Sequence, residues 1–349
     1  MCNNNGACRK ANVGVMCPSY RVTGDERHLT RGRANTLRLA LSGQLGRDAL
    51  VSDAMYDTMD LCVSCKGCRR ECPTGIDMAK MKLEFMAQYR KTHALSLRDR
   101  LIAWLPRYAP AASRFGFVLN LRNSLPGLAW LSEKLAGFSA KRKLPRWRSD
   151  YFDERRDAPQ SSDDTRPEVL LWVDTFNRFF EPDNARAAVA VLEAAGYRVL
   201  LPQPLDGGHP LSDGRTFLSA GLPVEAKAEA RRLLDAVMPQ VERGVPVIGL
   251  EPSSLLMLRD EFKSLMPGTE TDKLADQALL FEEFLVQQQR AGELNLDLKA
   301  LDYSRALVHG HCHQKAFATM DAMRDALALI PGLEIEVIDS GCCGMAGSF

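Results

Sequence analysis

Four closely spaced cysteines constrain this chain more than any other feature of its sequence. They form the run Cys62-x-x-Cys65-x-x-Cys68-x-x-x-Cys72-Pro73. With this spacing, three thiolates from one loop can occupy three corners of a 4Fe–4S cube, whereas the fourth cysteine, which precedes proline, ligates another cluster. Zinc sites instead favour paired C-x-x-C units that are separated by longer spacers. The motif therefore predicts an iron–sulfur cluster.

A cysteine further upstream offers the fourth ligand, because Cys17 is also followed by a proline. We therefore expect one 4Fe–4S cluster with ligands from two distant segments: Cys17, Cys62, Cys65 and Cys68. In a simpler alternative, Cys72 replaces Cys17 and all four ligands come from the motif. Basic residues within the motif would favour the reduced cluster, although a solvated basic loop explains them equally well.

A second cluster site has fewer thiolates. The upstream pattern Cys2-x-x-Asn5-x-x-Cys8 has the right spacing, but an asparagine stands at its middle position. Only three thiolates remain for this site: Cys2, Cys8 and Cys72. They could hold a three-iron cluster or a cube with one ligand that is not a cysteine, or they could simply pack.

The last three cysteines follow two strands that we expect near the C-terminus. Cys312 lies between a strand at 306–308 and a helix at 315–329, and Cys342 and Cys343 follow a strand at 335–338. Parallel strands release such loops at one edge of the sheet, where α/β proteins place their sites. We expect a cluster or a zinc ion here, with these candidate ligands: His311, Cys312, His313, Cys342 and Cys343. Each histidine could equally be a hydrogen-bonded orienter.

The distribution of the cysteines argues against a disulfide framework. Seven of the ten lie before residue 73, and the other three lie after residue 311. Disulfide-rich secreted domains distribute their cysteines through a short chain.

The N-terminus lacks the regions of a signal peptide, and no apolar run is long enough to span a bilayer. We therefore expect a cytoplasmic protein. Its net charge of +1 gives no indication of nucleic-acid binding.

Sequence texture predicts four segments. We expect an α-helical, ferredoxin-like 4Fe–4S domain at 1–90, a helical connection at 91–138, a linker at 139–167, and an α/β cysteine-rich domain with a parallel sheet at 168–349. The first domain should contain helices at 34–50 and 77–90, with Asp77 as an N-cap. Prolines at 106, 110 and 126 should break the connecting helices.

The α/β prediction rests on alternating strands and helices. The expected strands are 169–173, 197–201, 246–250, 306–308 and 335–338, and the expected helices of the first half are 184–195 and 226–240. The stretches 168–265 and 305–349 are expected to be two similar halves. The apolar helices of 91–138 should pack against a partner domain. Any membrane contact should be peripheral, at the inner face of the cytoplasmic membrane, and made through a partner.

Several motifs together resemble a known family. They include Cys2-Asn3-Asn4-Asn5-Gly6, Met16-Cys17-Pro18-Ser19-Tyr20, the cysteine run at 62–73, His311-Cys312-His313-Gln314-Lys315 and Gly341-Cys342-Cys343-Gly344. They resemble the C-terminal iron–sulfur and cysteine-rich (CCG-type) part of fused FAD-binding and iron–sulfur-binding oxidoreductases of the D-lactate, D-2-hydroxyglutarate and glycolate dehydrogenase type. The resemblance covers nearly the whole chain.

The resemblance also exposes departures. Where many relatives carry Cys-Cys-Gly in the first half, this chain has Asp206-Gly207-Gly208, and Ser254 stands where they carry a cysteine. The first half is therefore expected to have lost its metal and to serve as scaffold. The chain also resembles a fragment of a longer protein or a split gene product, because in relatives a flavin domain lies upstream and a helix and a further cysteine-bearing strand follow.

The resemblance implies an electron-transfer module of an oxidoreductase. FAD would reside on a partner or upstream domain that oxidises a D-2-hydroxy acid, and the final acceptor would be a quinone, cytochrome or flavoprotein. This chain has neither a G-x-G-x-x-G motif nor a P-loop, so by itself it should not turn over substrate. Two alternatives are a thiol–disulfide redox protein similar to heterodisulfide reductase and a non-enzymatic interaction module that zinc stabilises.

Overall fold

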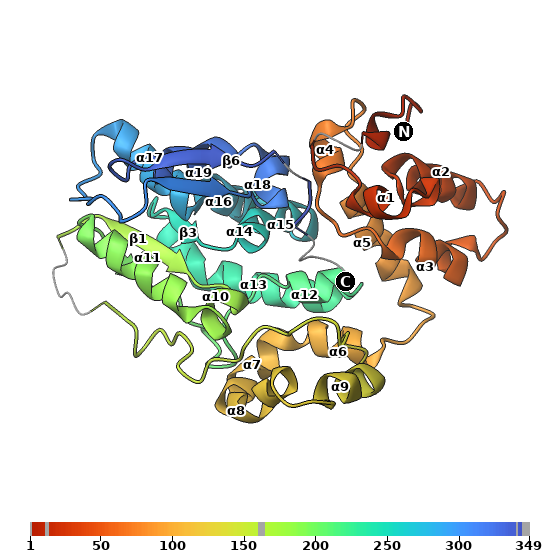
Figure 1. The fold of residues 1–349 in the computed structure, drawn as a ribbon, viewed down its shortest axis with the longest axis horizontal. Coiled ribbons are helices and arrows are strands. Elements are labelled where there is room, and N and C mark those ends of the chain that lie inside the picture. Colours follow the sequence, from red (N-terminus) through yellow and green to blue (C-terminus); the bar gives the residue numbers. More distant parts are fainter. Residues whose placement is uncertain (1, 11–13, 160–164, 340, 344–349) are drawn as a thin grey trace. The chain divides into compact units, whose positions relative to one another are not determined.

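The computed structural model describes residues 2–10, 14–159, 165–339 and 341–343. Their contacts divide the chain into two compact units (Figure 1). One combines Met1–Ala94 with Leu298–Phe349, and the other is Leu95–Asp297. We call them the cysteine unit and the sheet unit and describe each by itself. The domain boundaries near residues 90, 138 and 167 remain predictions.

The N-terminal part of the cysteine unit is built from short helices around a methionine-rich core. The expected helix at 77–90 is confirmed as α5, and Asp77 caps it by accepting a hydrogen bond from the Lys80 amide. The helix expected at 34–50 begins and ends earlier, as α2, and a turn at 42–45 follows it. The elements are η1 (Ala7–Arg9), α1 (Pro18–Thr23), η2 (Glu26–His28), α2 (Thr30–Leu41), η3 (Ala49–Val51), α3 (Asp53–Asp60), α4 (Gly67–Glu71) and α5 (Met78–Tyr89).

The C-terminal part of the cysteine unit is a strand–helix–helix–strand motif. Its strands β5 (Arg305–Val308) and β6 (Glu334–Val337) pair in parallel, as expected. The single helix predicted at 315–329 is wrong: α18 (Cys312–Phe317) and α19 (Met320–Leu327) are separate. Ala318 divides them with a left-handed φ of 61°, a conformation that no helix can continue through.

The sheet unit begins with short helices that carry few buried side chains. They are α6 (Leu97–Ala103), α7 (Leu105–Arg114), α8 (Gly116–Leu119), η4 (Asn120–Asn123) and α9 (Leu128–Ala136). The expected break at Pro110 is wrong, since this proline lies inside α7. Pro106 stands at the start of the same helix, where its missing N–H costs nothing.

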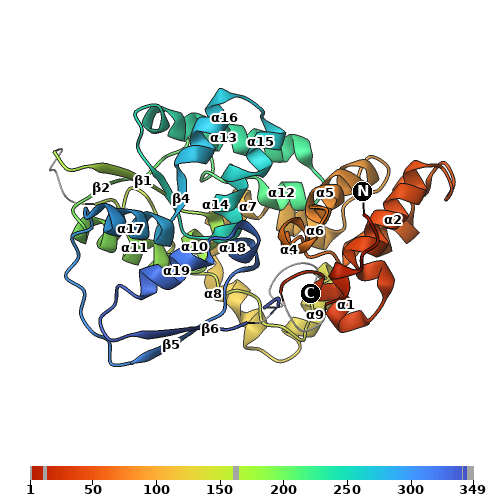
Figure 2. The ribbon, with the colours of Figure 1, turned by 90° about the horizontal axis from the view of Figure 1, so that it is seen from above.

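The centre of the sheet unit is a four-stranded parallel sheet, and Figure 2 labels its strands β1, β2 and β4 among the helices of the unit. Its order is β2-β1-β3-β4, and all three pairings are parallel, as the alternation predicted. The strands are β1 (Glu168–Trp172), β2 (Arg198–Leu200), β3 (Val247–Gly249) and β4 (Ala278–Leu280). The sequence did not indicate β4, because three apolar residues between two helices carry no strand period.

Helices cover both faces of this sheet. On one face, Val169 and Leu171 pack with residues of α11 and α17, and on the other Gly249 lies so close to Leu255 of α14 that a Cβ would clash. The helices are α10 (Thr175–Phe179), α11 (Pro182–Ala194), α12 (Arg215–Ser219), α13 (Pro223–Val241), α14 (Pro252–Arg259), α15 (Glu261–Leu265), α16 (Thr269–Gln277) and α17 (Phe281–Ala291). None of the described helices is long and apolar enough to cross a bilayer.

The segment predicted as a linker has no helix or strand in its described part, yet it packs closely. The Arg148 and Phe152 amides donate to the carbonyls of Phe179 and Arg178, at 3.1 and 2.9 Å. Phe152 is fully buried and belongs to the sheet core. The segment therefore contributes to the fold of the sheet unit.

Candidate functional site

A small cavity in the cysteine unit brings together cysteines from two distant segments. It is lined by Cys17 from one segment and by Cys62, Cys65 and Cys68 from the other. Thr30, Arg33, Lys66 and Met78 complete much of the wall. The described side chains thus place the four predicted cluster ligands around one space.

Three residues that are not glycine adopt left-handed backbone conformations at this cavity. Cys17, Ser64 and Lys66 have φ values of 55°, 53° and 57°. Each costs on the order of 1 kcal/mol for a residue with a Cβ, and such strain concentrates at functional sites. Cys17 is also the N-cap residue of α1, so its backbone turns just before the helix begins.

Glu71 joins the two cysteine segments. Its carboxylate accepts hydrogen bonds from the Val15 amide at 2.6 Å and from the Met16 amide at 2.9 Å. Gly14 lies against the same carboxylate, has a φ of 78°, and leaves no space for a Cβ. The segment before Cys17 is therefore fixed to helix α4, which ends the loop of Cys62, Cys65 and Cys68.

Two of the cavity's sulfur atoms accept hydrogen bonds. The Thr30 amide and hydroxyl each lie 3.0 Å from Cys17 Sγ, and the Met78 amide donates to Cys68 Sγ at 3.3 Å. Met78 begins α5, so the positive end of that helix faces the sulfur. Such donors stabilise thiolate ligands and tune the potential of a bound cluster.

The pKa values of these thiols and of Cys72 are shifted in opposite directions. Burial raises the pKa of Cys17 and Cys65 above the usual range and raises the pKa of Cys68 to about 12. Burial would also raise the pKa of Cys72, but hydrogen bonds from Thr74 and nearby backbone amides outweigh it and lower that pKa. Buried thiolates are costly unless a metal compensates their charge. The three buried thiols thus suit metal ligation.

Buried basic side chains lie in and near the wall of the cavity. Arg33 is buried and donates to the Thr58 carbonyl at 2.9 Å, the His28 carbonyl at 2.7 Å and Ser19 Oγ at 3.0 Å. Lys82 Nζ donates to the Asp60 and Cys62 carbonyls at 2.8 and 2.7 Å, and burial lowers its pKa. Sequence reasoning did not assign a role to either residue, because their helices read as ordinary amphipathic helices.

Buried positive charge of this kind offsets the negative charge of a cluster with four thiolate ligands. Lys66, which the sequence placed within the cysteine run, is also buried in the cavity wall. The thiols as ligands, together with the N–H donors and the buried cations around them, fit a 4Fe–4S cluster.

The cysteines of the second predicted site are less completely grouped. Cys8 is buried and interacts electrostatically with both Cys2 and Cys17. Asn5, which stands where a ligand would be expected, is exposed, and its side-chain oxygen accepts from the Ala7 amide at 2.9 Å. Cys72 lies 3.2 Å from the Thr74 hydroxyl. Whether these cysteines hold a cluster stays a prediction.

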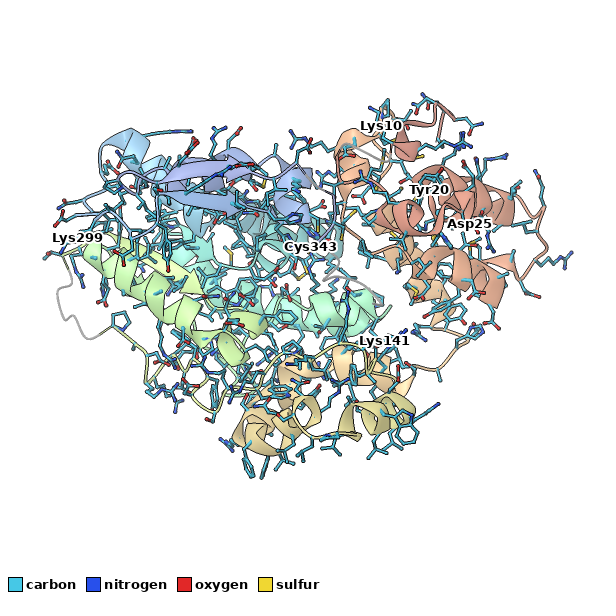
Figure 3. The ribbon with its side chains drawn as sticks, in the orientation of Figure 1. Lys10, Tyr20, Asp25, Lys141, Lys299 and Cys343 are labelled. Carbon is cyan, nitrogen blue, oxygen red and sulfur yellow. The ribbon has the colours of Figure 1, made fainter. Side chains whose placement is uncertain are left out.

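The C-terminal group contains three adjacent candidate ligands. Among the described residues, the ligand atoms of His311, Cys312 and His313 lie within 4.8 Å of one another. The His311 amide donates to the side-chain oxygen of Gln314 at 3.1 Å, which fixes the start of α18. This mutual group does not include Cys342 or Cys343, and the latter is exposed and labelled in Figure 3.

Helix α18 packs on the cysteine loop of the same unit. Arg70 Nη1 donates to the Lys315 carbonyl at 2.6 Å. The Phe317 ring faces Arg69 and Lys66, whose charged groups lie 4.9 and 5.4 Å from its centroid. Cys312 consequently lies close enough to Cys65 for their charges to interact. The sequence did not predict this contact, which joins residues far apart in the chain.

The corresponding loops of the sheet unit contain ion pairs where relatives are expected to carry cysteines. Asp206 accepts two hydrogen bonds from Arg232, at 2.7 and 2.9 Å. Arg232 also donates to the buried Glu229 at 3.0 Å. This arrangement is a structural network of charges without a thiol ligand.

Comparison with known proteins agrees with the cysteine geometry. Residues 1–76 match the family described as "4Fe-4S dicluster domain". This segment is an iron–sulfur domain. The matched segment contains the cavity cysteines and also the three of the weaker second group. No solved structure matched the chain significantly.

The similarity to curated relatives extends beyond residues 1–76. The chain is 26% identical to a "D-2-hydroxyglutarate dehydrogenase" of Pseudomonas putida, with all of this chain and 37% of that protein covered. It is 25% identical to one subunit of the anaerobic glycerol-3-phosphate dehydrogenase of Escherichia coli, covering 79% and 68%. It is 24% identical to the "Glycolate oxidase iron-sulfur subunit" of Escherichia coli, covering 95% and 77%. The chain thus spans just over a third of the dehydrogenase relative's length, in its C-terminal part.

Proposed function

We propose that this chain is the iron–sulfur electron-transfer part of a flavin-dependent 2-hydroxyacid dehydrogenase of the D-2-hydroxyglutarate, glycolate or D-lactate class. One observation carries the electron-transfer role: four cysteines from two segments line one cavity in a domain that matches an iron–sulfur family. The similarity to D-2-hydroxyglutarate dehydrogenases and to a glycolate oxidase iron–sulfur subunit supports the choice of dehydrogenase class. When bound in this cavity, a 4Fe–4S cluster supplies one-electron transfer. Its four thiolate ligands leave no open position for substrate, which favours electron transfer over substrate chemistry.

Each part of the cavity has a role in this proposal. Cys17, Cys62, Cys65 and Cys68 are the proposed ligands. The Thr30 and Met78 amides stabilise the sulfurs, while Arg33 and Lys82 compensate negative charge from within the protein. Glu71 holds the two ligand segments together.

The group of His311, Cys312 and His313 is proposed as a second redox or metal site, with Cys342 and Cys343 as further candidate ligands. Its support is the contact of α18 with the cysteine loop, through Arg70 and Phe317. That contact would favour exchange of electrons between a redox metal or cluster held at Cys312 and the cluster held by the cysteine loop, over a role as an isolated zinc site. The flavin is proposed to reside on a partner domain or subunit, and the acceptor to be a quinone, cytochrome or flavoprotein.

Anaerobic reconstitution followed by metal analysis and low-temperature EPR tests the proposal. Iron and acid-labile sulfide should be present in equal amounts, and reduction should produce the signal of a reduced 4Fe–4S cluster. The reconstituted chain should not oxidise a 2-hydroxy acid until a flavoprotein is added. A colourless protein that binds only zinc would contradict the proposal and favour an interaction module. Steady turnover without flavin would contradict the proposal that a separate flavoprotein oxidises the substrate.

A further inference from the structure

The helices α6 to α9 expose an unusual amount of apolar surface. Of the 23 large hydrophobic side chains that are exposed in the described part of the chain, eleven lie between Leu97 and Leu135. The most exposed are Phe117 (73%), Leu135 (68%), Phe115 (62%) and Trp130 (58%). Soluble proteins seldom leave large apolar side chains so concentrated without a binding role.

In the same part of the chain, nearly all of the charged residues are basic. Residues 100–149 contain ten lysines and arginines but a single acidic residue, Glu133, in a chain whose total charge is only +1. Arg114, Lys134, Lys141, Lys143 and Arg146 are all exposed. Outside residues 100–149, acidic residues outnumber basic ones by 43 to 35, so this region accounts for the positive sign of the chain's net charge.

Hydrogen bonds hold the basic run against the apolar helices. The side chain of Asn120 accepts from the Trp147 amide and donates to the Trp147 carbonyl, both at 2.9 Å. Asn123 clamps Leu144 in the same two-way manner, at 2.8 and 3.1 Å. Arg122 donates to the carbonyls of Ser139 and Arg142, at 2.8 and 3.0 Å. The 141–148 segment, with Lys141 labelled in Figure 3, is thus fixed beside η4, between α8 and α9.

We propose that α8, η4, α9 and the 141–148 segment form a site that binds the surface of an anionic membrane. Aromatic and branched side chains beside a polybasic rim are the features of interfacial binding, with the apolar groups at the acyl boundary and the lysines at the lipid phosphates. A protein partner fits less well, because lysine is depleted in protein interfaces and a partner would need an unbroken acidic face. The site is independent of the proposed cluster and does not need a spanning helix.

Co-sedimentation of the full chain with vesicles tests this site. The chain should pellet with vesicles that contain about a third phosphatidylglycerol in phosphatidylcholine, but not with phosphatidylcholine alone. Binding should weaken in about 0.5 M salt, where charges are screened. The pair Phe117→Ser and Trp130→Ser, and separately Lys141→Glu and Lys143→Glu, should each reduce the partition coefficient at least about tenfold.

A matched control uses another exposed part of the sheet unit. Val224→Ser with Lys227→Glu removes an apolar group that is 77% exposed and a lysine, and it should leave binding unchanged. Circular dichroism should show the same fold for all variants. The proposal is overturned if the wild type does not bind anionic vesicles or if the patch variants bind them as well as the control does. It is equally overturned if the wild type self-associates in sedimentation velocity and only the patch variants do not, since a second copy would then be the occupant.

Discussion

The cavity of the cysteine unit and the loops of the sheet unit show two ways of burying polar groups. In the cysteine unit, thiols line a cavity and are accompanied by buried cations and strained backbone. In the sheet unit, the loops after the parallel strands contain carboxylates, of which Asp174 and Glu251 cap the helices that follow. The cysteine unit groups thiols around one cavity, whereas the sheet unit uses carboxylates of these loops as helix caps. All ten cysteines of the chain belong to the cysteine unit, so the proposed redox chemistry is assigned to that unit.

The largest expected effect separates the two cysteine arrangements. Replacing Cys17 with alanine should abolish cluster assembly, because this residue lines the cavity, whereas Cys72→Ala should keep most of the iron. Iron, sulfide and the EPR signal of the reconstituted variants provide the measurement. If Cys72→Ala loses the cluster and Cys17→Ala keeps it, all four ligands come from the motif and our assignment is wrong.

A second test concerns a buried carboxyl group of the sheet unit. Asp213 is buried, one of its oxygens accepts from the Arg215 amide at 3.0 Å, and burial raises its pKa from 3.8 to about 6. A raised pKa in the fold means that this group's contribution to stability is fully present below about pH 4 and is lost as the pH rises through about 6.

Asp213→Asn, which mimics the protonated form, should therefore be more stable than wild type at pH 8 by about 1–3 kcal/mol, with the difference shrinking towards pH 4. Urea unfolding at several pH values measures it. Asp206→Asn is a control of opposite sign, since the pKa of the exposed Asp206 is lowered by its hydrogen bonds with Arg232. A pH-independent difference for Asp213→Asn would show that its carboxyl is not the titrating group.

The smallest effect concerns cluster potential. Lys82→Gln should lower the midpoint potential by on the order of 50 mV, because a desolvated cation beside the Cys62 carbonyl favours the more negative, reduced state. Lys91→Gln removes an exposed lysine of the same unit and should leave the potential unchanged. An EPR-monitored redox titration distinguishes the two. An unchanged potential in Lys82→Gln would restrict this lysine to a structural role.

The sequence by itself indicated the candidate ligand residues and the main strands, but it predicted neither β4 nor the helices α14 to α17. The spacing of Cys62, Cys65 and Cys68 predicts an iron–sulfur loop, because the geometry of the cube sets the distances between its ligands. The alternation of strands and helices likewise predicted the parallel sheet, because it too is a pattern that can be recognised along the sequence. The cap at Asp77 and the boundaries of α5 were also readable, since caps depend on nearby residues.

Only the tertiary structure decided which distant groups meet. The link from Glu71 to the Cys17 segment, the buried Arg33 and Lys82, and the contact of α18 with the cysteine loop all join residues that no local pattern connects. Ala318 divided a helix that its periodicity had predicted to continue. Local sequence fixes what a short segment can bind, but long-range packing fixes which segments share a site, because the burial that drives folding is summed over the whole chain.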